Sequence, residues 1–153
     1  MDPKLQSGNK KTVVGNEPLF TLKITSQLSE LPAHSIRQYI DEGLIIPYKL
    51  ESKRHLFSEY DIQRLRLIRH LIRDRGLNFT GIRALLAMIP CWGIRGCSKK
   101  DRNSCGAYSE NFQPCWNASE KGRECLNVNC RDCEVYHIID LELGIKTRLK
   151  SLI

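Results

Sequence analysis

All seven cysteines of this 153-residue chain lie in one segment, between Cys91 and Cys133. Residues 1–90 contain no cysteine, and several stretches of them carry the apolar spacing of helices. The cysteine segment is rich in glycine and poor in large apolar residues, so it can bury too little surface to order itself. A bound metal or cluster can supply the missing stability. The sequence therefore predicts two joined parts, one built around an apolar core and one around thiols.

The chain divides at the borders of this segment. Residues 1–18 are mostly polar, and we expect a disordered leader. Residues 19–90 form a helical domain, residues 91–133 form the cysteine-rich module, and residues 134–153 form a final helix. The final helix carries apolar residues at spacings of three and four. Two interpretations stay open for it: a short coiled-coil seam that joins two copies of the chain, or a stripe that packs on its own domain.

The sequence also indicates the cellular compartment in which the thiols lie. No apolar run approaches the roughly 20 residues that cross a bilayer, and residues 1–16 show no secretory signal. We therefore expect a cytoplasmic protein without a membrane partner. Thiols stay reduced there, and clustered cysteines bind metal more often than they form disulfides. The odd number of cysteines also argues against a complete set of disulfides.

Charge and motifs together favour DNA over catalysis. Residues 1–90 carry 14 Lys and Arg against 9 Asp and Glu, a net charge of +5, whereas residues 91–153 carry 10 against 8. A basic domain favours a polyanionic partner through the release of counterions. The sequence contains no Ser/His/Asp set, phosphate-binding loop or catalytic carboxylate pair, and we expect no enzyme.

Residues 19–90 have the element order of a winged helix-turn-helix. Two short helices meet at Pro32, and Gly43 ends the second. Residues 44–57 alternate in character like a β-hairpin with a charged tip, which is the wing. Ser58 and Asp61 form the capping pattern of a long third helix, and Asn78 can cap a fourth. The fold class we expect is mainly α, with a small hairpin wing, an irregular metal-bound cysteine module and a C-terminal helix.

Three stretches of this domain resemble the MerR-type transcription regulators. The first runs from Phe20-Thr21-Leu22 to Gly43-Leu44-Ile45, and the second is Phe57-Ser58-Glu59-Tyr60-Asp61-Ile62-Gln63-Arg64-Leu65. The third, Gly76-Leu77-Asn78-Phe79-Thr80-Gly81-Ile82, is similar to the heat-shock-repressor branch of the family. The resemblance covers roughly residues 20–90. It implies a dimer that binds double-stranded DNA at two half-sites, with RNA polymerase as a possible further partner at the promoter.

The resemblance also implies which residues meet DNA. Arg37 matches a recognition-helix arginine at the DNA backbone, and Tyr39 matches a tyrosine that helps dock this helix. For Tyr39, a place in the core and a contact with phosphate are equally open. The full expected set is His34, Ser35, Arg37, Gln38, Tyr39, Lys53, Arg54 and His55. The chain departs from the family pattern at Glu30, where a turn glycine is usual, at Gln38, and at Arg54-His55 in the wing.

The cysteine module contains a faint duplication. Pro90-Cys91-Trp92 leads to Cys105-x2-Tyr108, and Pro114-Cys115-Trp116 leads to Cys133-x2-Tyr136. Two such units suggest paired loops around a shared centre. All seven cysteines are candidate ligands: Cys91, Cys97, Cys105, Cys115, Cys125, Cys130 and Cys133. We expect the nearby His137 to be a helix-surface residue and not a ligand.

The choice of metal rests on ligand spacing. Only Cys130 and Cys133 form a CxxC pair, whereas zinc usually takes two such pairs. Separated single cysteines beside aromatic residues suit an iron–sulfur cluster better, and [4Fe-4S] is the form we favour over zinc. The MerR-type family also includes members with a metal or an iron–sulfur centre beyond the DNA-binding part, with different cysteine spacing.

Three functions are therefore in view. The first is a sequence-specific transcription regulator whose cysteine module binds a cluster or metal and senses redox or metal state. The second is a DNA-binding regulator with a purely structural zinc site. The third, a thiol redox or electron-transfer protein that uses Cys130 and Cys133, is disfavoured because this CxxC pair lacks the βαβ context of redox enzymes.

Overall fold

The structure is a computed structural model that describes residues 15–138 and 144–152. Most of the predicted leader lies outside the described residues. Its last part does not: the backbone carbonyl of Gly15 accepts a hydrogen bond from the Tyr60 N–H at 3.0 Å. The Asn16 amide donates to the Asp132 carboxylate at 2.9 Å. The folded part therefore already includes Gly15, and the leader prediction is too long at this end.

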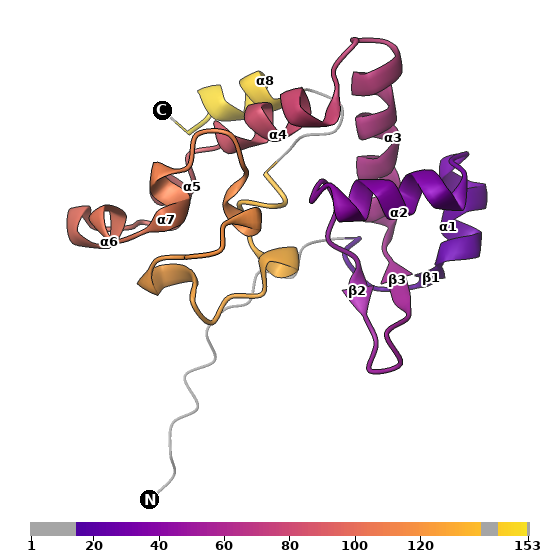
Figure 1. Ribbon diagram of the computed structural model, residues 1–153, viewed down its shortest axis with the longest axis horizontal. Helices are drawn as coiled ribbons and strands as arrows, with labels where there is room; N and C mark the ends of the chain where they lie inside the picture. Colours follow the sequence, from indigo (N-terminus) through magenta and orange to yellow (C-terminus); the bar gives the residue numbers. More distant parts are fainter. Residues whose placement is uncertain (1–14, 139–143, 153) are drawn as a thin grey trace, which may run out of the picture.

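The winged helix-turn-helix prediction is confirmed. Its elements, in chain order, are β1 (Phe20–Thr21), α1 (Leu22–Ser29), α2 (Ala33–Asp41), β2 (Tyr48–Lys49), β3 (His55–Phe57), α3 (Glu59–Arg73) and α4 (Phe79–Ala87). The predicted hairpin is β2 and β3, and its tip projects from the body of the domain (Figure 1). The sequence did not predict β1, which pairs with the other edge of β3 and makes a sheet of order β1-β3-β2.

The predicted helix boundaries rest on side chains that satisfy free backbone groups. At the start of α3 the Ser58 N–H donates to Asp61 Oδ2 at 2.8 Å, and the Asp61 N–H donates to Ser58 Oγ at 3.1 Å. Asn78 caps α4 by accepting from the Gly81 N–H at 2.7 Å. Gly43 follows α2 with φ of 70°, a left-handed conformation that glycine adopts without strain. These local signals are why the helices begin and end where the sequence places them.

The buried face of α1 differs from its apolar pattern. Thr25 and Ser29 are buried, and the Ser29 hydroxyl donates to the Thr25 carbonyl at 2.6 Å. Ile24 and Leu28 are each 42% exposed. Apolar spacing alone therefore predicted the helix but not the side of it that faces the core.

The cysteine module is irregular, as predicted. It consists of short turns of helix: α5 (Cys91–Ile94), α6 (Lys99–Asn103), α7 (Gly106–Ser109), and the 3-10 turns η1 (Cys115–Asn117), η2 (Arg123–Cys125) and η3 (Cys130–Asp132). The helix expected over residues 134–153 differs. Residues 134–137 form a turn, residues 139–143 lie outside the described part, and α8 covers Gly144–Lys150. The turn forms because the side chains that follow Cys133 pack inward.

One apolar core joins the two parts of the chain. It contains Ile36, Leu44 and Phe57 of the winged domain. The same core contains Trp116, Val135, Tyr136 and Ile138 from the cysteine module and the turn after it. In Figure 1 the module lies beside α2 and the wing, below α4. The module is therefore not a separate appendage: its second half completes the core of the winged domain.

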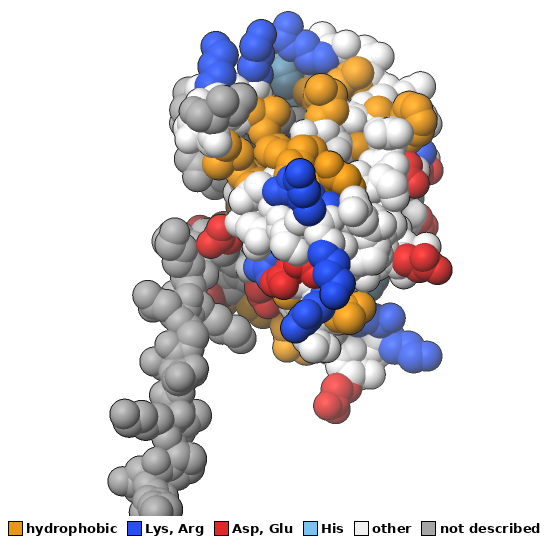
Figure 2. All heavy atoms as spheres, turned by 90° about the vertical axis from the view of Figure 1, so that its left-hand side faces the viewer, with side chains coloured by type: hydrophobic (Ala, Val, Ile, Leu, Met, Phe, Trp, Pro, Cys, Tyr) orange, Lys and Arg blue, Asp and Glu red, His pale blue; other side chains and the backbone are white. Residues whose placement is uncertain are grey.

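The outer face of the module is mixed in character. Figure 2 shows hydrophobic side chains gathered in a band on this face, with Lys and Arg above and below it. Large side chains that are exposed in residues 88–126 include Met88, Phe112 and Leu126, each at least 67% exposed. Among the described residues, no helix is both long and apolar enough to cross a membrane.

Candidate functional site

The outward face of α2 carries the polar side chains that the resemblance assigned to DNA. His34, Arg37 and Gln38 are exposed, and Ser35 is half-buried. Ile36 lies on the opposite face and is fully buried. This division leaves an uncovered face with one permanent positive charge, the kind of surface that enters a major groove and holds phosphate.

Tyr39 lies on the core side of the same helix. It is 6% exposed, and its ring meets the Phe79 ring edge-on, with centroids 5.8 Å apart. Burial raises the pKa of the Tyr39 hydroxyl. Of the two roles left open by the sequence, the geometry supports the one in which Tyr39 docks α2 on the domain.

The wing presents further basic side chains. Lys53 and Arg54 are exposed at its tip, where the Lys53 N–H donates to the Leu50 carbonyl at 2.9 Å. Lys53 has φ of 63°, so the tight turn places a non-glycine residue in the left-handed region. His55 is half-buried and its ring packs edge-on to Phe57, 6.5 Å between centroids. Lys49 of β2 is exposed as well, so the exposed cations of the wing are Lys49 in the strand and Lys53 and Arg54 at the tip.

All seven predicted metal ligands meet at one place. Their side chains line a single cavity of about 40 Å³. The four aromatic residues of the two Pro-Cys-Trp units, Trp92, Tyr108, Trp116 and Tyr136, line the same cavity. All seven thiols are free of disulfides. The structure therefore brings together cysteines that are up to 42 positions apart in the sequence.

The faint sequence duplication has a geometric counterpart. The Trp92 and Tyr108 rings meet edge-on, with centroids 5.3 Å apart and planes at 88°. The Trp116 and Tyr136 rings repeat this contact at 5.2 Å and 84°. The two units thus form equivalent aromatic pairs on the cavity wall. Such pairs are stabilising beyond their buried area, and they exclude water from the thiols.

The seven thiols divide into an inner and an outer group. We call Cys91, Cys115, Cys130 and Cys133 the inner cysteines because these four pack against the apolar core. The Cys91 and Cys115 thiols are hydrogen-bonded to each other, which lowers the pKa of Cys91 and raises that of Cys115. Burial and the charges of Cys130 and Cys133 raise the pKa of Cys115 further, and all four side chains line the same cavity.

The remaining three, the outer cysteines, lie further from the core. Burial and neighbouring acidic groups raise the pKa of Cys97, and burial raises that of Cys125. Cys105 accepts a hydrogen bond from the Gly122 N–H at 3.2 Å. The outer group is thus packed into the module without contact with the main core.

A basic side chain lies beside one thiol of the inner group and another lies beside one thiol of the outer group. The Lys121 ammonium lies 3.1 Å from Cys130 Sγ, and the Arg95 guanidinium hydrogen-bonds to Cys125. Donors of this kind favour the thiolate, which is the form that binds metal. Hydrogen bonds to sulfur also tune the reduction potential of iron–sulfur clusters.

The donor set can be tested against the two candidate cofactors. Zinc bonds to sulfur at about 2.3 Å in a tetrahedron, so four zinc ligands crowd within about 4 Å of one another. In the part of the chain that the structure describes, no three His, Cys, Asp or Glu side chains converge in this way. Four thiols from three different loops around a shared, aromatic-walled cavity suit a cluster, whose sulfur ligands are spread over several irons.

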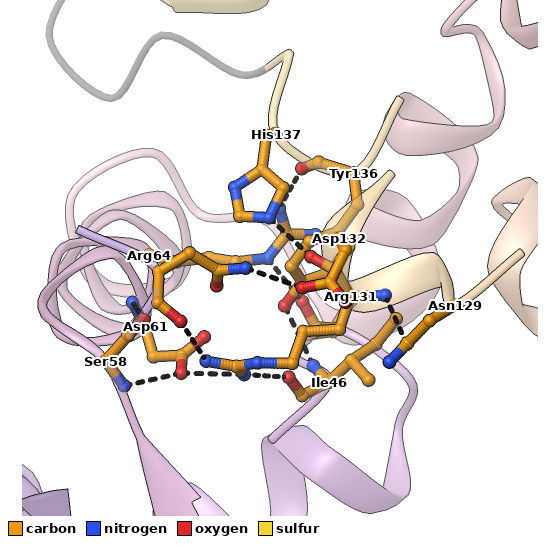
Figure 3. Close-up of polar contacts among 11 residues, drawn as sticks. Ile46, Ser58, Asp61, Arg64, Asn129, Arg131, Asp132, Tyr136 and His137 are labelled. Atoms are coloured by element: carbon orange, nitrogen blue, oxygen red, sulfur yellow. Dashed lines mark hydrogen bonds and ion pairs between the residues drawn. The ribbon is translucent and has the colours of Figure 1, made fainter. Parts of the chain in front are cut away.

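The segment between α2 and the wing is held by side chains of the module. Trp116 Nε1–H donates to the Gly43 carbonyl at 2.8 Å. The Ile46 N–H donates to the Tyr136 hydroxyl at 2.8 Å, and Arg131 Nη1 donates to the Ile46 carbonyl at 2.7 Å (Figure 3). A Cβ atom on Gly43 would overlap the Asn117 side-chain amide, and the φ of 70° at Gly43 also favours glycine. The module therefore holds residues 43–46 at both ends.

Two buried arginines also contribute to this contact between the module and the winged domain, and the sequence revealed neither of them. Arg64 of α3 is 1% exposed. Its Nε donates to the Leu44 carbonyl at 2.8 Å, and its guanidinium lies 3.9 Å from the centre of the Tyr136 ring. Arg131 is 2% exposed and forms an ion pair with Asp61 at 2.9 Å. Arg64 stands three residues after Asp61 and four before buried Ile68, and this spacing is the signal that could have revealed it.

His137 is not the helix-surface residue that the sequence predicted. Its side chain is half-buried, it hydrogen-bonds to the Arg131 carbonyl, and its ring lies 4.4 Å from that of Tyr60. Burial lowers its pKa. It does not line the thiol cavity, so the prediction that it is no metal ligand agrees with its position.

Comparison with known proteins places the winged domain. The model of the MerR helix-turn-helix family of regulatory proteins matches residues 20–89, and so ends before Cys91. The chain is 39% identical to the HTH-type transcriptional regulator GlnR of Bacillus anthracis and of Bacillus cereus over 71 residues. These residues make up 46% of this chain and 54% of GlnR. Over 80 residues it is 29% identical to HspR of Streptomyces coelicolor, named as a heat shock protein, which is 52% of this chain and 53% of HspR.

These matches cover about half the length of each relative as well as about half of this chain. The matched residues 20–89 contain α2, the wing and the caps of α3 and α4. The predicted resemblance to MerR-type proteins, including the heat-shock-repressor branch, is thereby confirmed. Residues 20–89 of this chain form a helix-turn-helix domain of the MerR family.

Proposed function

We propose that this chain is a sequence-specific DNA-binding transcription regulator that acts in the cytoplasm. The observation that carries the proposal is the uncovered polar face of α2, with Arg37 exposed beside a wing that ends in Lys53 and Arg54. A helix and a wing that approach one duplex together can read base edges and hold phosphates. GlnR, which matches in this domain, is named as a transcriptional regulator, in agreement with this role. We expect no catalytic role.

The active form we propose is a homodimer, because one winged domain reads only one half of a two-fold site. The region after Tyr136 supplies the second contact, through the helix α8. Contact with RNA polymerase at the promoter belongs to the same proposal. Each of these expectations comes from the family, and the sequence of the bound site stays to be found by selection.

The cysteine module in this proposal holds a [4Fe-4S] cluster through the inner cysteines. Four thiolates are the usual ligand set of such a cluster, and the four inner cysteines line the cavity and pack against the apolar core. When bound, the cluster supplies a one-electron couple and a structure that oxidation can disassemble. The protein supplies the aromatic wall, the Lys121 hydrogen bond to Cys130 and the connection to residues 43–46. The signal we propose is redox or metal state.

A second candidate keeps DNA binding and gives the module a purely structural zinc ion. The observation that favours it is the shared core: the inner cysteines pack on the same apolar residues that support α2. A metal there would hold the fold together without sensing anything. The two candidates differ in colour, metal content and sensitivity to oxygen.

Metal analysis separates these candidates. The full chain is purified without oxygen, and iron, sulfide and zinc are measured together with the visible spectrum. Our proposal expects a brown protein with about four irons and four sulfides per chain. A colourless protein with one zinc per chain would support the structural site, and a protein without either would refute both.

DNA binding is tested with Arg37→Ala on a duplex selected from a random-sequence library. Loss of a recognition-helix contact should weaken binding about tenfold or more, with an unchanged melting temperature because Arg37 is exposed. The matched control is Lys99→Ala, which removes one exposed positive charge from α6 in the module. Full affinity in the Arg37 variant would contradict the assignment.

A further inference from the structure

We propose that Arg131 and Tyr136 form a clamp on Ile46 that transmits the state of the thiol centre to the DNA-reading surface. We call these three residues the Ile46 clamp. The inference rests on the proposed function, since it assumes a metal or cluster in the module and DNA at α2. Arg131 and Tyr136 are neither proposed ligands nor proposed DNA contacts. Their role in this proposal is to position α2 relative to the wing.

The clamp satisfies both backbone polar groups of one residue. The N–H of Ile46 donates to the Tyr136 hydroxyl, and its carbonyl accepts from Arg131 Nη1 (Figure 3). Ile46 lies between α2 and β2, outside the hydrogen bonds of the small sheet. The path of the chain from recognition helix to wing is therefore set by partners in the module and not by its own strand pairing.

Arg131 ties this point to the start of α3 as well. The same guanidinium that holds Ile46 forms the buried ion pair with Asp61, and Asp61 accepts the Ser58 N–H that caps α3. Its Nη2 also donates to the Asn16 carbonyl at 3.4 Å. Asp61 is fully buried, so the arginine cannot leave without exposing an unpaired charge to an apolar surrounding. The contact between the module and the domain through this ion pair therefore has two states, formed or broken.

The thiols control the position of this arginine. Arg131 stands between Cys130 and Cys133 in the turn η3, and Tyr136 follows Cys133 by three positions. Within the turn, the Asp132 N–H donates to the Asn129 carbonyl at 3.0 Å, the Cys133 N–H donates to the Cys130 carbonyl at 3.1 Å, and the Asn129 side chain accepts from the Arg131 N–H at 3.1 Å. A metal that binds both sulfurs fixes this turn, and its loss removes that constraint within one residue of Arg131. The proposed coupling therefore needs only a local change in η3.

The clamp makes a quantitative prediction about coupling. If it transmits the state of the thiols, the affinities of metal-loaded and metal-stripped wild-type protein for the selected duplex should differ by about tenfold, within the range of known coupled sites. Two variants remove the clamp in different ways. Arg131→Leu combined with Asp61→Asn removes both charges together, and Tyr136→Phe removes only the hydroxyl and keeps the ring.

The experiment measures metal content, melting temperature and the ratio of the two DNA affinities for each protein. We expect the double variant to load metal like the wild type and to bind DNA with a ratio within about twofold of one. Tyr136→Phe should give an intermediate ratio, and it carries the test if the double variant does not fold. The control is Arg123→Leu, an exposed arginine of the same module, which should keep the wild-type ratio.

The outcomes separate this inference from the function on which it rests. Folded, metal-loaded clamp variants that keep the wild-type ratio would overturn the clamp and leave the regulator intact. A wild-type ratio near one, or a wild-type protein that takes up no metal, would refute the proposed sensing function and the clamp with it. A ratio that falls in the clamp variants alone, at unchanged metal content, supports the coupling.

Discussion

The MerR domain and the cysteine module reach a defined structure by different means. In the domain, each of α3 and α4 starts at a capping side chain three residues from its partner, and α2 ends at a left-handed glycine. In the module, the helices have five residues or fewer, and the order comes from contacts between distant loops. Trp116 reaches Gly43 and Arg131 reaches Asp61, across 73 and 70 positions of sequence. The order of the module therefore depends on the domain and on its thiols, whereas the helix ends of the domain are set by local signals.

The strongest way to test this contrast is to remove one thiol from each group. Cys115→Ser should abolish cluster binding, because Cys115 is one of the four inner cysteines, whereas Cys97→Ser should keep most of the iron because Cys97 is an outer cysteine. In small metal-bound folds, loss of the metal can lower the free energy of unfolding by on the order of 10 kcal/mol. Iron and sulfide analysis checks both variants. Equal loss of iron in the two would show that the inner and outer groups are not distinct.

The joint between the two parts is tested by Asp61→Ala. The change deletes the capping box of α3 and leaves Arg131 buried without its partner, so we expect unfolding to become easier by about 3–5 kcal/mol. Urea unfolding gives the free energy. Glu59→Ala, in the same first turn but exposed, is the matched control and should cost less than about 1 kcal/mol. Similar losses in both would mean that the ion pair contributes little to the joint.

The smallest expected effect lies wholly within the domain. Glu30 has φ of 57° at the end of α1, where the MerR-type family usually has glycine, so Glu30→Gly should stabilise the chain by about 0.5–1 kcal/mol. Met88→Gly, at the end of α4 with φ of −75°, should instead destabilise it, because glycine loses more freedom there. Thermal unfolding compares the two. A loss of stability in Glu30→Gly would argue that the side chain of Glu30 has a role beyond the turn.

The same contrast explains what the sequence could predict. The hairpin and the caps at Ser58 and Asn78 follow from local motifs and spacing, and the structure agrees. The gathering of all seven thiols at one cavity goes beyond the paired loops that the sequence suggested. The pairing of β1 and the buried roles of Arg64 and Arg131 do not follow from local motifs, because they depend on which distant surfaces meet. An arginine is predicted to lie on the surface unless its partners are known. Here those partners are backbone carbonyls and the buried Asp61.

The duplication of Pro-Cys-Trp and Cys-x2-Tyr is an intermediate case. The sequence suggested paired loops, and the equal geometry of the Trp92–Tyr108 and Trp116–Tyr136 pairs agrees with it. Only the second pair became part of the core of the domain, with Tyr136 at 1% exposed and Tyr108 at 41%. Repetition in the sequence therefore indicated the shape of the centre but not which repeat faces the domain.

The most direct test of the account is amide hydrogen exchange at residues 43–46, measured on wild-type protein before and after the metal is removed. The Ile46 N–H is bound to the Tyr136 hydroxyl, so its exchange reports on the clamp itself. We predict that removal of the metal speeds exchange of this amide at least about tenfold, while amides in the middle of α3 stay protected. Unchanged protection of Ile46 in a protein that has lost its metal would show that the thiols and the DNA-reading surface are not coupled.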